Sequence, residues 1–269
     1  MLFVGGLLTD DLHRRSAQTI CADARGRSSR HLPPARTRPS STVTFQKAMS
    51  TSPSAKRLYF VRHGHTDWNV RGLFQGHSDI PLNEEGERDA HGYAALLRDY
   101  FARHPETPAI GRVTASPLAR AARTARIICE DLAPAGLVPP PSAITHDARL
   151  KEQNYGLWEG KTLAQIREAF PGSVERQFAS MRTFAADAGE PMPDLCSRVA
   201  ACVQEQENNT LLVGHFGTLY ALMLTLWPES PDNFPRITQD AFYLIEGTNI
   251  VRFDRDTPDG RPIRPGRPS

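Results

Sequence analysis

The stretch RLYFVRHGHTDWN, residues 57–69, decides the fold of this chain. It opens with a short apolar run, residues 57–62, of the kind that forms a buried strand in a parallel sheet. The run ends in a polar segment, residues 62–69, that carries Arg, His, Thr, Asp and Asn. Open α/β sheets bind their ligands at the carboxyl ends of such strands. The stretch therefore predicts both the first strand of a sheet and the first part of a binding site.

Strand and helix patterns alternate after this stretch. Asn83 is a suitable cap for a helix that begins at Glu84, and apolar residues then recur at helical spacing as far as Phe101. Two residues, Gly247 and Thr248, separate a pair of strand-like runs near the end of the chain. This alternation predicts an α/β fold, a three-layer α/β/α sandwich with a mainly parallel central sheet. The other predicted strands are residues 110–115 and 210–214, and the other predicted helices lie within residues 118–128, 195–203 and 216–227.

The two ends of the chain differ in composition from the middle. Residues 1–55 are rich in Arg, Ser and Pro, residues 255–269 are rich in Pro and Gly, and neither end shows a periodic apolar pattern. We expect both ends to be disordered and the folded domain to span residues 56–254. Two other interpretations of the first segment stay open: an organellar transit peptide, or a translation start assigned too early, with Met49 as the initiator.

Charge and cysteine content exclude several classes of protein. The chain has a formal net charge of +2, but residues 58–254 carry 18 Lys and Arg against 25 Asp and Glu. A net acidic domain does not indicate a nucleic-acid partner. No stretch has the roughly 20 apolar residues that a membrane span needs, so we expect no membrane partner. The cysteines form no C-x-x-C pair, which favours reduced thiols in a cytoplasmic protein; they are Cys21, Cys129, Cys196 and Cys202.

Three polar clusters follow predicted strands, at residues 62–69, 116–120 and 214–217. The carboxyl ends of parallel strands share one edge of a sheet, so we expect the clusters to meet there. Arginines and histidines are costly to bury unless an anion pairs with them, and a doubly charged phosphate fits such a site. We expect Gly64 and Gly217 to let backbone N–H groups approach the same anion.

The polar clusters belong to longer blocks of sequence, and a fourth block lies between them. The blocks are RHGHTDWN (62–69), SPLARAARTA (116–125), LKEQNYGLWEG (150–160) and LLVGHFGTL (211–219). They resemble, in the family's order, those of the histidine phosphatase superfamily, which is also called phosphoglycerate-mutase-like. RHG alone is common by chance, but four blocks in order are specific. The resemblance extends over residues 57–254 and implies the phosphoglycerate-mutase-like form of the α/β/α sandwich.

The resemblance also implies a mechanism that needs no metal or other cofactor. His63 matches the family's nucleophile, which forms a phosphohistidine, and Glu152 matches the general acid/base. Glu152 must keep a proton near neutral pH, and we expect partial burial and a second acidic or phosphate neighbour to raise its pKa. The residues that match phosphate-binding positions are Arg62, Thr66, Asn69, Arg120 and His215.

Several other polar residues lie in or near these blocks. We expect Glu159 to support the loop of the WEG segment rather than to act as the acid. Arg123 and Arg126 are expected on the solvated surface. A zinc site is conceivable from the H-x-H spacing, with His63, His65 and His77 as ligands, although it would compete with phosphate for His63. An apolar lid over the substrate and an ordinary core patch remain equally open for Trp158, Phe178, Met181 and Phe184.

The main functional choice is between a phosphohydrolase and a cofactor-dependent phosphoglycerate mutase. Mutases of the family place an Arg directly after the catalytic Glu, whereas Gln153 stands here, so a phosphohydrolase acting on a small phosphorylated substrate is favoured. Family phosphatases often read G-G-E-S where Pro191 replaces the Ser, so this part of the pocket departs from the family's pattern. A catalytically inactive binding module is the third possibility.

The apolar segment 242–245 is either an interior strand or the edge of a homodimer.

Overall fold

The computed structural model describes residues 56–229 and 237–264, and the predictions for residues 1–55 lie outside these ranges. One seven-stranded sheet runs through the described part of the chain, in the order β3-β2-β4-β1-β5-β6-β7. Strands β1 to β4 pair in parallel, and β5, β6 and β7 extend the sheet antiparallel to their neighbours. The strands are β1 Arg57–Arg62, β2 Arg112–Ala115, β3 Thr145–His146, β4 Thr210–Gly214, β5 Phe242–Glu246, β6 Asn249–Phe253 and β7 Arg261–Ile263.

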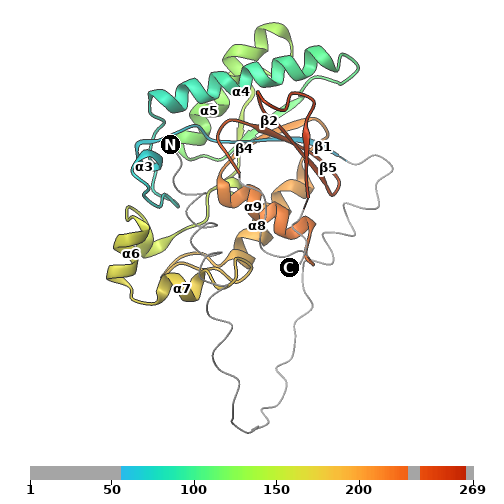
Figure 1. Cartoon of the computed structure of the whole chain (residues 1–269). Helices are drawn as coiled ribbons and strands as arrows, with labels where there is room; N and C mark the ends of the chain where they lie inside the picture. The colour runs from blue at the N-terminus through green and yellow to red at the C-terminus, as the bar shows by residue number, and fades with distance from the viewer. Residues whose placement is uncertain (1–55, 230–236, 265–269) are drawn as a thin grey trace.

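Helices cover both faces of this sheet, as Figure 1 shows, with α4 and α5 on one side and α8 and α9 on the other. The predicted three-layer α/β/α sandwich is therefore confirmed. The α-helices are α3 Asp67–Val70, α4 Glu84–Arg103, α5 Ala119–Leu132, α6 Leu163–Ala169, α7 Ser173–Gln177, α8 Met192–Glu205 and α9 Phe216–Leu226. Short 3₁₀ helices are η1 Ala133–Ala135, η2 Pro141–Ala143, η3 Ala148–Leu150 and η4 Gly156–Trp158.

The core is divided in two by the central strands, because successive side chains of a strand point to opposite faces. Tyr59 and Val61 of β1 pack in the cluster that also holds the apolar faces of α4 and α5. Leu58 and Phe60 pack in the cluster that holds α8 and α9. β5 lies between β1 and β6, so the segment 242–245 is an interior strand rather than an exposed edge.

The loop after β1 is fixed by the start of α4. Asn83 caps this helix as predicted, with its side chain accepting a hydrogen bond from the backbone N of Gly86 at 2.9 Å. A Cβ atom at Gly64 would lie 2.2 Å from the carbonyl oxygen of Gly86, so only glycine allows the two segments to approach this closely. The contact sets the position of His63 relative to the helical layer.

The prediction that residues 255–269 are disordered is wrong for residues 255–264. Asp254 Oδ1 accepts hydrogen bonds from the backbone N of Asp256 and of Thr257, which turns the chain back on itself. Residues 261–263 then form β7 beside β6. The Pro-rich composition is compatible with this edge strand, because Pro262 needs no ladder hydrogen bond on its outer side.

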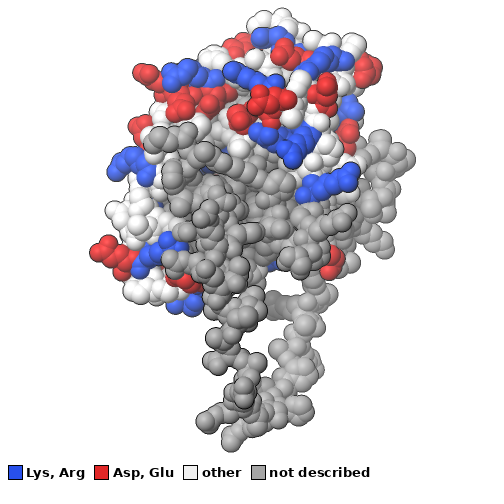
Figure 2. Space-filling model, in the orientation of Figure 1, with Lys and Arg blue, Asp and Glu red and all other residues white. Residues whose placement is uncertain are grey.

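Charged side chains of both signs are interspersed on the face seen in Figure 2, over α4 and α5. Arg123 pairs with Glu87 at 2.9 Å, and Arg126 pairs with Glu130 at 2.9 Å, so both arginines lie on the surface as expected. None of the described helices has the length and apolarity required to cross a bilayer.

Candidate active site

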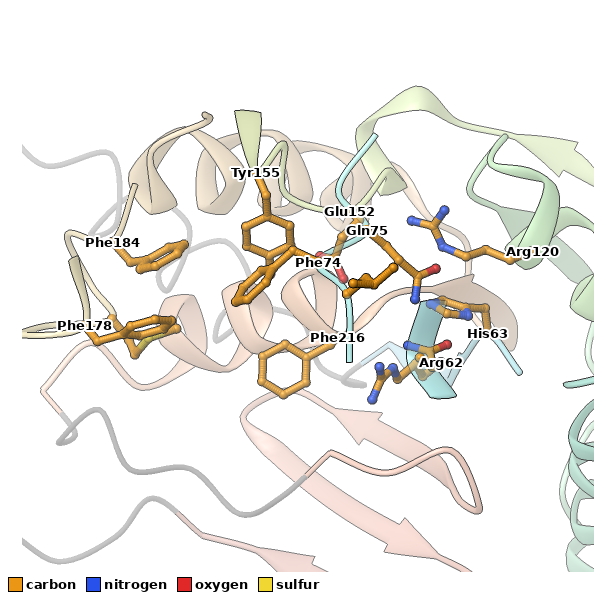
Figure 3. A pocket seen from close by; sticks show the side chains of 13 residues that line it. Arg62, His63, Phe74, Gln75, Arg120, Glu152, Tyr155, Phe178, Phe184 and Phe216 are labelled. Carbon is orange, nitrogen blue, oxygen red and sulfur yellow. The ribbon is translucent and has the colours of Figure 1, made fainter. Parts of the chain in front are cut away.

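A cavity opens at the carboxyl ends of β1, β2 and β4, where the three polar clusters were expected to meet. It encloses about 620 Å³, including space that is open to solvent. Five of the predicted site residues line it: Arg62, His63, Asn69, Arg120 and Glu152. Figure 3 shows Arg62, His63, Arg120 and Glu152 around the cavity. The other lining residues are Leu73, Phe74, Gln75, Tyr155, Phe178, Met181, Phe184 and Phe216.

His63 presents a free ring nitrogen in this cavity. Its Nδ1 lies 2.7 Å from the carbonyl oxygen of Gly64, and a carbonyl only accepts, so Nδ1 carries the ring proton. The lone pair is then on Nε2. Burial, followed by the positive charges of Arg120 and Arg62, holds the pKa of His63 well below its usual value. The imidazole is neutral and can act as a nucleophile.

Two buried guanidinium groups flank the cavity. Arg120 donates from Nη1 to the carbonyl oxygen of Ser78 at 2.8 Å and from Nη2 to that of Gly76 at 2.9 Å, which leaves its Nε without a partner. The Nε of Arg62 is also buried and without a partner. Buried donors are normally satisfied, so the pair indicates a site for an anion. Burial lowers the pKa of Arg120 to about 10, which still leaves it charged at neutral pH.

His215 lies beside His63 rather than among the lining residues. Their ring centroids are 5.1 Å apart. His215 is the N-cap residue of α9, and its Nε2 is 2.8 Å from the hydroxyl of Ser116. Its Nδ1 is buried and without a partner. Burial holds the pKa of His215 well below its usual value, so this ring is neutral too.

Glu152 is held by backbone groups on one side of its carboxyl. Oε1 accepts from the backbone N of Gln153 and from that of Gly217, each at 2.9 Å, so a proton on this carboxyl belongs on Oε2. Burial raises the pKa of Glu152, and the Gln153 hydrogen bond and the nearby arginines oppose the rise. Burial was expected to raise this pKa and is the cause of the rise, whereas no acidic side chain contributes to it.

The backbone N–H groups of Gly64 and Gly217 are bound to other groups of the protein. They are therefore not available to an anion, contrary to the expectation. The N–H of Gly217 is engaged by Glu152, and that of Gly64 donates to the hydroxyl of Thr124 at 3.2 Å. A Cβ atom at Gly217 would lie 2.2 Å from Glu152 Oε1, so glycine at this position is required for the carboxyl to reach the helix start.

Asn69 and Thr66 form the capping box of α3. Asn69 Oδ1 accepts from the backbone N of Thr66 at 3.1 Å, and Gln239 Nε2 approaches the same oxygen at 3.5 Å. Because these contacts occupy Oδ1, the amide nitrogen of Asn69 is the group available to a ligand.

Thr66 is fully buried and is not a lining residue. Its hydroxyl lies 3.0 Å from Asn69 Oδ1 and 3.0 Å from Gln75 Oε1, so it supports two side chains that line the cavity. Gln75 also lines the cavity, and no pattern in the sequence indicates this.

Glu159 supports a loop, as expected. Oε1 accepts from the backbone N of His77 at 2.8 Å, and Oε2 accepts from that of Ser78 at 2.8 Å. These bonds hold residues 76–78 in place. Arg120 donates to two carbonyl oxygens of the same segment, those of Gly76 and Ser78. Glu159 thus positions one wall of the cavity.

The three histidines of the alternative zinc site have separate partners. The Nδ1 of His63 lies 2.7 Å from the carbonyl oxygen of Gly64. The Nδ1 of His65 lies 2.6 Å from a carboxylate oxygen of Asp89, and the Nε2 of His77 lies 3.0 Å from the carbonyl oxygen of Glu152. Within residues 56–229 and 237–264, no three His, Cys, Asp or Glu side chains are grouped as metal ligands.

An ion pair supports the segment that carries Glu152. Arg198 Nη1 donates to the carbonyl oxygens of Arg149 at 2.6 Å and Lys151 at 2.7 Å, and its Nη2 donates to that of Glu152 at 2.8 Å. Its Nε donates to Glu190 Oε1 at 2.6 Å. One guanidinium therefore fixes the backbone of this segment at three residues. Nothing in the sequence patterns had indicated this role.

The apolar patch expected from the sequence is part of the core and also forms a wall of the cavity. Phe178 and Phe184 are buried in the same core cluster as Trp158, Met181 packs against that cluster, and all but Trp158 line the cavity. Trp158 is fully buried in the core, and its Nε1 donates to Asp187 Oδ2 at 2.8 Å.

Comparisons with known proteins agree with the resemblance. Residues 58–259 match the sequence profile of the histidine phosphatase superfamily (branch 1). A 2,3-bisphosphoglycerate-dependent phosphoglycerate mutase of Cytophaga hutchinsonii is 31% identical over 187 residues, which cover 67% of this chain and 81% of the mutase. The relatives similar in sequence thus include a mutase.

The solved structures that superpose on this chain include a phosphatase. A mycobacterial glucosyl-3-phosphoglycerate phosphatase in complex with VO3 superposes with a TM-score of 0.56 at 29% identity, over 71% of this chain and 92% of that one. YhfR of Bacillus stearothermophilus superposes with a TM-score of 0.55 at 27% identity, over 77% of this chain and 95% of that one. The predicted fold is therefore shared with these proteins.

Proposed function

The chain belongs to the histidine phosphatase superfamily, and we propose that it is a phosphohydrolase that cleaves small phosphate monoesters through a phosphohistidine on His63, without a metal. One observation carries the proposal: a single cavity is lined by a neutral histidine, two arginines with unpartnered buried N–H groups, and a buried carboxyl of raised pKa. These are the groups that phosphoryl transfer to a histidine requires.

In the first step the Nε2 lone pair of His63 attacks phosphorus, and a P–N bond forms as the P–O bond to the alcohol breaks. The Nε atoms of Arg62 and Arg120 supply donors for the phosphoryl oxygens, where charge is spread in the transition state. Ser116 Oγ accepts from the backbone N of Leu118, so its hydroxyl can donate to Nε2 of His215 and leave the ring proton on Nδ1. That unpartnered Nδ1 and the amide nitrogen of Asn69 are further candidate donors. The leaving alkoxide takes the proton of Glu152, and the alcohol is released.

In the second step Glu152, now ionised, accepts a proton from water as the water oxygen attacks phosphorus. The P–N bond breaks, inorganic phosphate forms, and the lone pair returns to His63. Both steps use the same carboxyl in opposite protonation states. A pKa raised by burial suits this alternation near neutral pH.

The alternative, a phosphoglycerate mutase, has the support of the mutase relative. A mutase must retain a carboxylated substrate so that the phosphoryl group returns to it. The position that carries Arg in such enzymes holds Gln153, whose side chain is buried and donates to the carbonyl oxygen of Glu190 at 2.7 Å. Without a cation there, the dephosphorylated product leaves and water reaches the phosphohistidine. This observation favours hydrolysis.

The choice is testable with two assays on the full chain. We expect p-nitrophenyl phosphate to be hydrolysed at the same rate with and without EDTA, because no step uses a metal. With 3-phosphoglycerate and a trace of 2,3-bisphosphoglycerate, we expect no 2-phosphoglycerate. Rapid isomerisation without phosphate release would replace the proposal with a mutase. A folded protein that turns over no ester would instead support the inactive binding module.

Arg198→Gln is expected to lower kcat for phosphate esters about 100-fold with little change in KM. The variant removes the charged donor that fixes the carbonyl oxygens of Arg149, Lys151 and Glu152, and small displacements of a reacting group are costly. The measurement is steady-state kinetics with p-nitrophenyl phosphate. Arg126→Gln is the matched control, because Arg126 also pairs with a glutamate but is 64% exposed.

Arg198→Lys gives a second readout of positioning. A lysine keeps the charge but cannot reach the same set of carbonyl oxygens, so partial recovery of kcat is expected. If Arg198→Gln had an unchanged kcat and an unchanged thermal midpoint, the guanidinium would not position the acid.

A further inference from the structure

The cavity has two chemically different ends. Figure 3 shows Arg62, His63 and Arg120 together at one end, and the rings of Tyr155, Phe178 and Phe184 at the other. Resting on the proposed function, we infer that this site selects phosphate monoesters whose leaving group is uncharged and apolar, with an aromatic ring fitting best. Esters that carry a second negative charge on the leaving group are then poor substrates.

The apolar end is a continuous wall of side chains. The rings of Phe178 and Phe184 are tilted to each other with centroids 5.0 Å apart. Tyr155 bridges from Phe184, at 6.1 Å, to Phe74, at 5.2 Å, with edge-to-face geometry at both contacts. Rings arranged in this way hold one another in place and offer edges and faces to a further ring. Met181 adds a flexible apolar side chain that adapts to the shape of a ligand.

The two ends meet at Phe216. The guanidinium carbon of Arg62 lies 5.8 Å from the centroid of this ring, and both residues line the cavity. A phosphoryl group at Arg62 and His63 therefore has an apolar surface directly beside it. The leaving group of an ester bound there passes Glu152 and continues along the aromatic wall.

Within residues 56–229 and 237–264, no positive side chain lines the apolar end of the cavity. Arg62 and Arg120 are the positive side chains among the described lining residues, and both are at the phosphate end. Burial holds the pKa of the Tyr155 hydroxyl well above its usual value, so this wall stays neutral. Arg182, next to Met181 in the chain, is not a lining residue, and its Nη2 donates to the carbonyl oxygen of Trp227 at 3.0 Å. A carboxylate buried at this end would lose its hydration without gaining an ion pair, which is unfavourable.

Benzyl phosphate and 4-carboxybenzyl phosphate test the inference. The two leaving alcohols are of similar size and basicity, so a difference in kcat/KM reports recognition rather than chemistry. For the full-length protein we expect benzyl phosphate to be favoured by roughly tenfold or more, the range that a mismatched pocket produces. The measurement is the release of inorganic phosphate from each ester.

Met181→Arg is expected to lower or reverse the ratio of kcat/KM for benzyl phosphate to that for 4-carboxybenzyl phosphate, because it places a cation at the apolar end. Leu157→Arg is the matched control, because Leu157 is 51% exposed and is not a lining residue. The control variant should have the same ratio as the wild-type protein. Equal kcat/KM for the two esters in the wild-type protein would overturn the inference and leave the phosphohydrolase intact. Release of phosphate from neither ester would overturn the proposed function, and the inference with it.

Discussion

His63→Ala is expected to lower kcat for p-nitrophenyl phosphate by about 10⁴-fold or more, the cost typical of removing a covalent nucleophile. His63 is the lining residue with an imidazole lone pair directed away from the backbone, since its Nδ1 is bound to Gly64. His215 is not a substitute, because its Nε2 is engaged by Ser116 and it is not a lining residue.

A rapid acid-free quench with ³²P-labelled substrate should trap an acid-labile phosphoenzyme in the wild-type protein and none in His63→Ala. His91→Ala is the control, because the His91 side chain is 59% exposed and pairs with Asp131 on the surface. Inorganic phosphate should still protect the variant against thermal unfolding, because Arg62 and Arg120 are retained. Undiminished turnover by His63→Ala would refute the mechanism.

The position of His63 was predictable because it depends on local signals that act together. An apolar run short enough for a strand is followed at once by a polar segment, and the strand forms at Arg57–Arg62 as predicted. Thr210–Gly214 shows the same pattern and is also a strand with the predicted bounds. Parallel pairing of β1 with β4 then places both following segments at one edge of the sheet. Helix α4 was predictable for a similar reason, since one residue, Asn83, marks its start.

The supporting contacts were not predictable, because they join residues that are far apart in the chain. Arg198 is 46 residues from Glu152, whose carbonyl oxygen it fixes. Gln75 comes from a segment without strand or helix periodicity, and only the folded chain brings it to the cavity. Burial was expected to raise the pKa of Glu152, but the groups that oppose the rise, the Gln153 backbone N–H and the nearby arginines, are brought to it only by the folded chain. β7 was missed because a Pro-rich tail has the composition of a disordered segment, yet Asp254 forms a turn that returns it to the sheet.

Glu152→Gln is expected to lower kcat for benzyl phosphate about 10²- to 10⁴-fold, the usual contribution of a positioned acid. A benzyl alkoxide is a poor leaving group without a proton, whereas p-nitrophenolate leaves unaided. The variant should therefore still release p-nitrophenolate in a burst equal to the enzyme concentration. Slow turnover should follow, because the phosphohistidine then lacks the base that activates water. Stopped-flow absorbance measures both phases, and Glu130→Gln, a change at an exposed ion pair, is the control.

The pH dependence of kcat/KM for benzyl phosphate distinguishes the titration of His63 from that of Glu152. Burial lowers the pKa of His63, so the nucleophile stays neutral into acidic solution, and activity is lost only when the pH falls below that lowered pKa. Burial raises the pKa of Glu152, so the acid keeps its proton to a higher pH than an exposed carboxyl, and activity is lost as the pH rises through that pKa. Glutamine does not titrate, so Glu152→Gln should lose the alkaline limb and keep the acidic one. An alkaline limb that survives in Glu152→Gln would assign the proton to a different residue, since no change at His63 produces a loss in that direction.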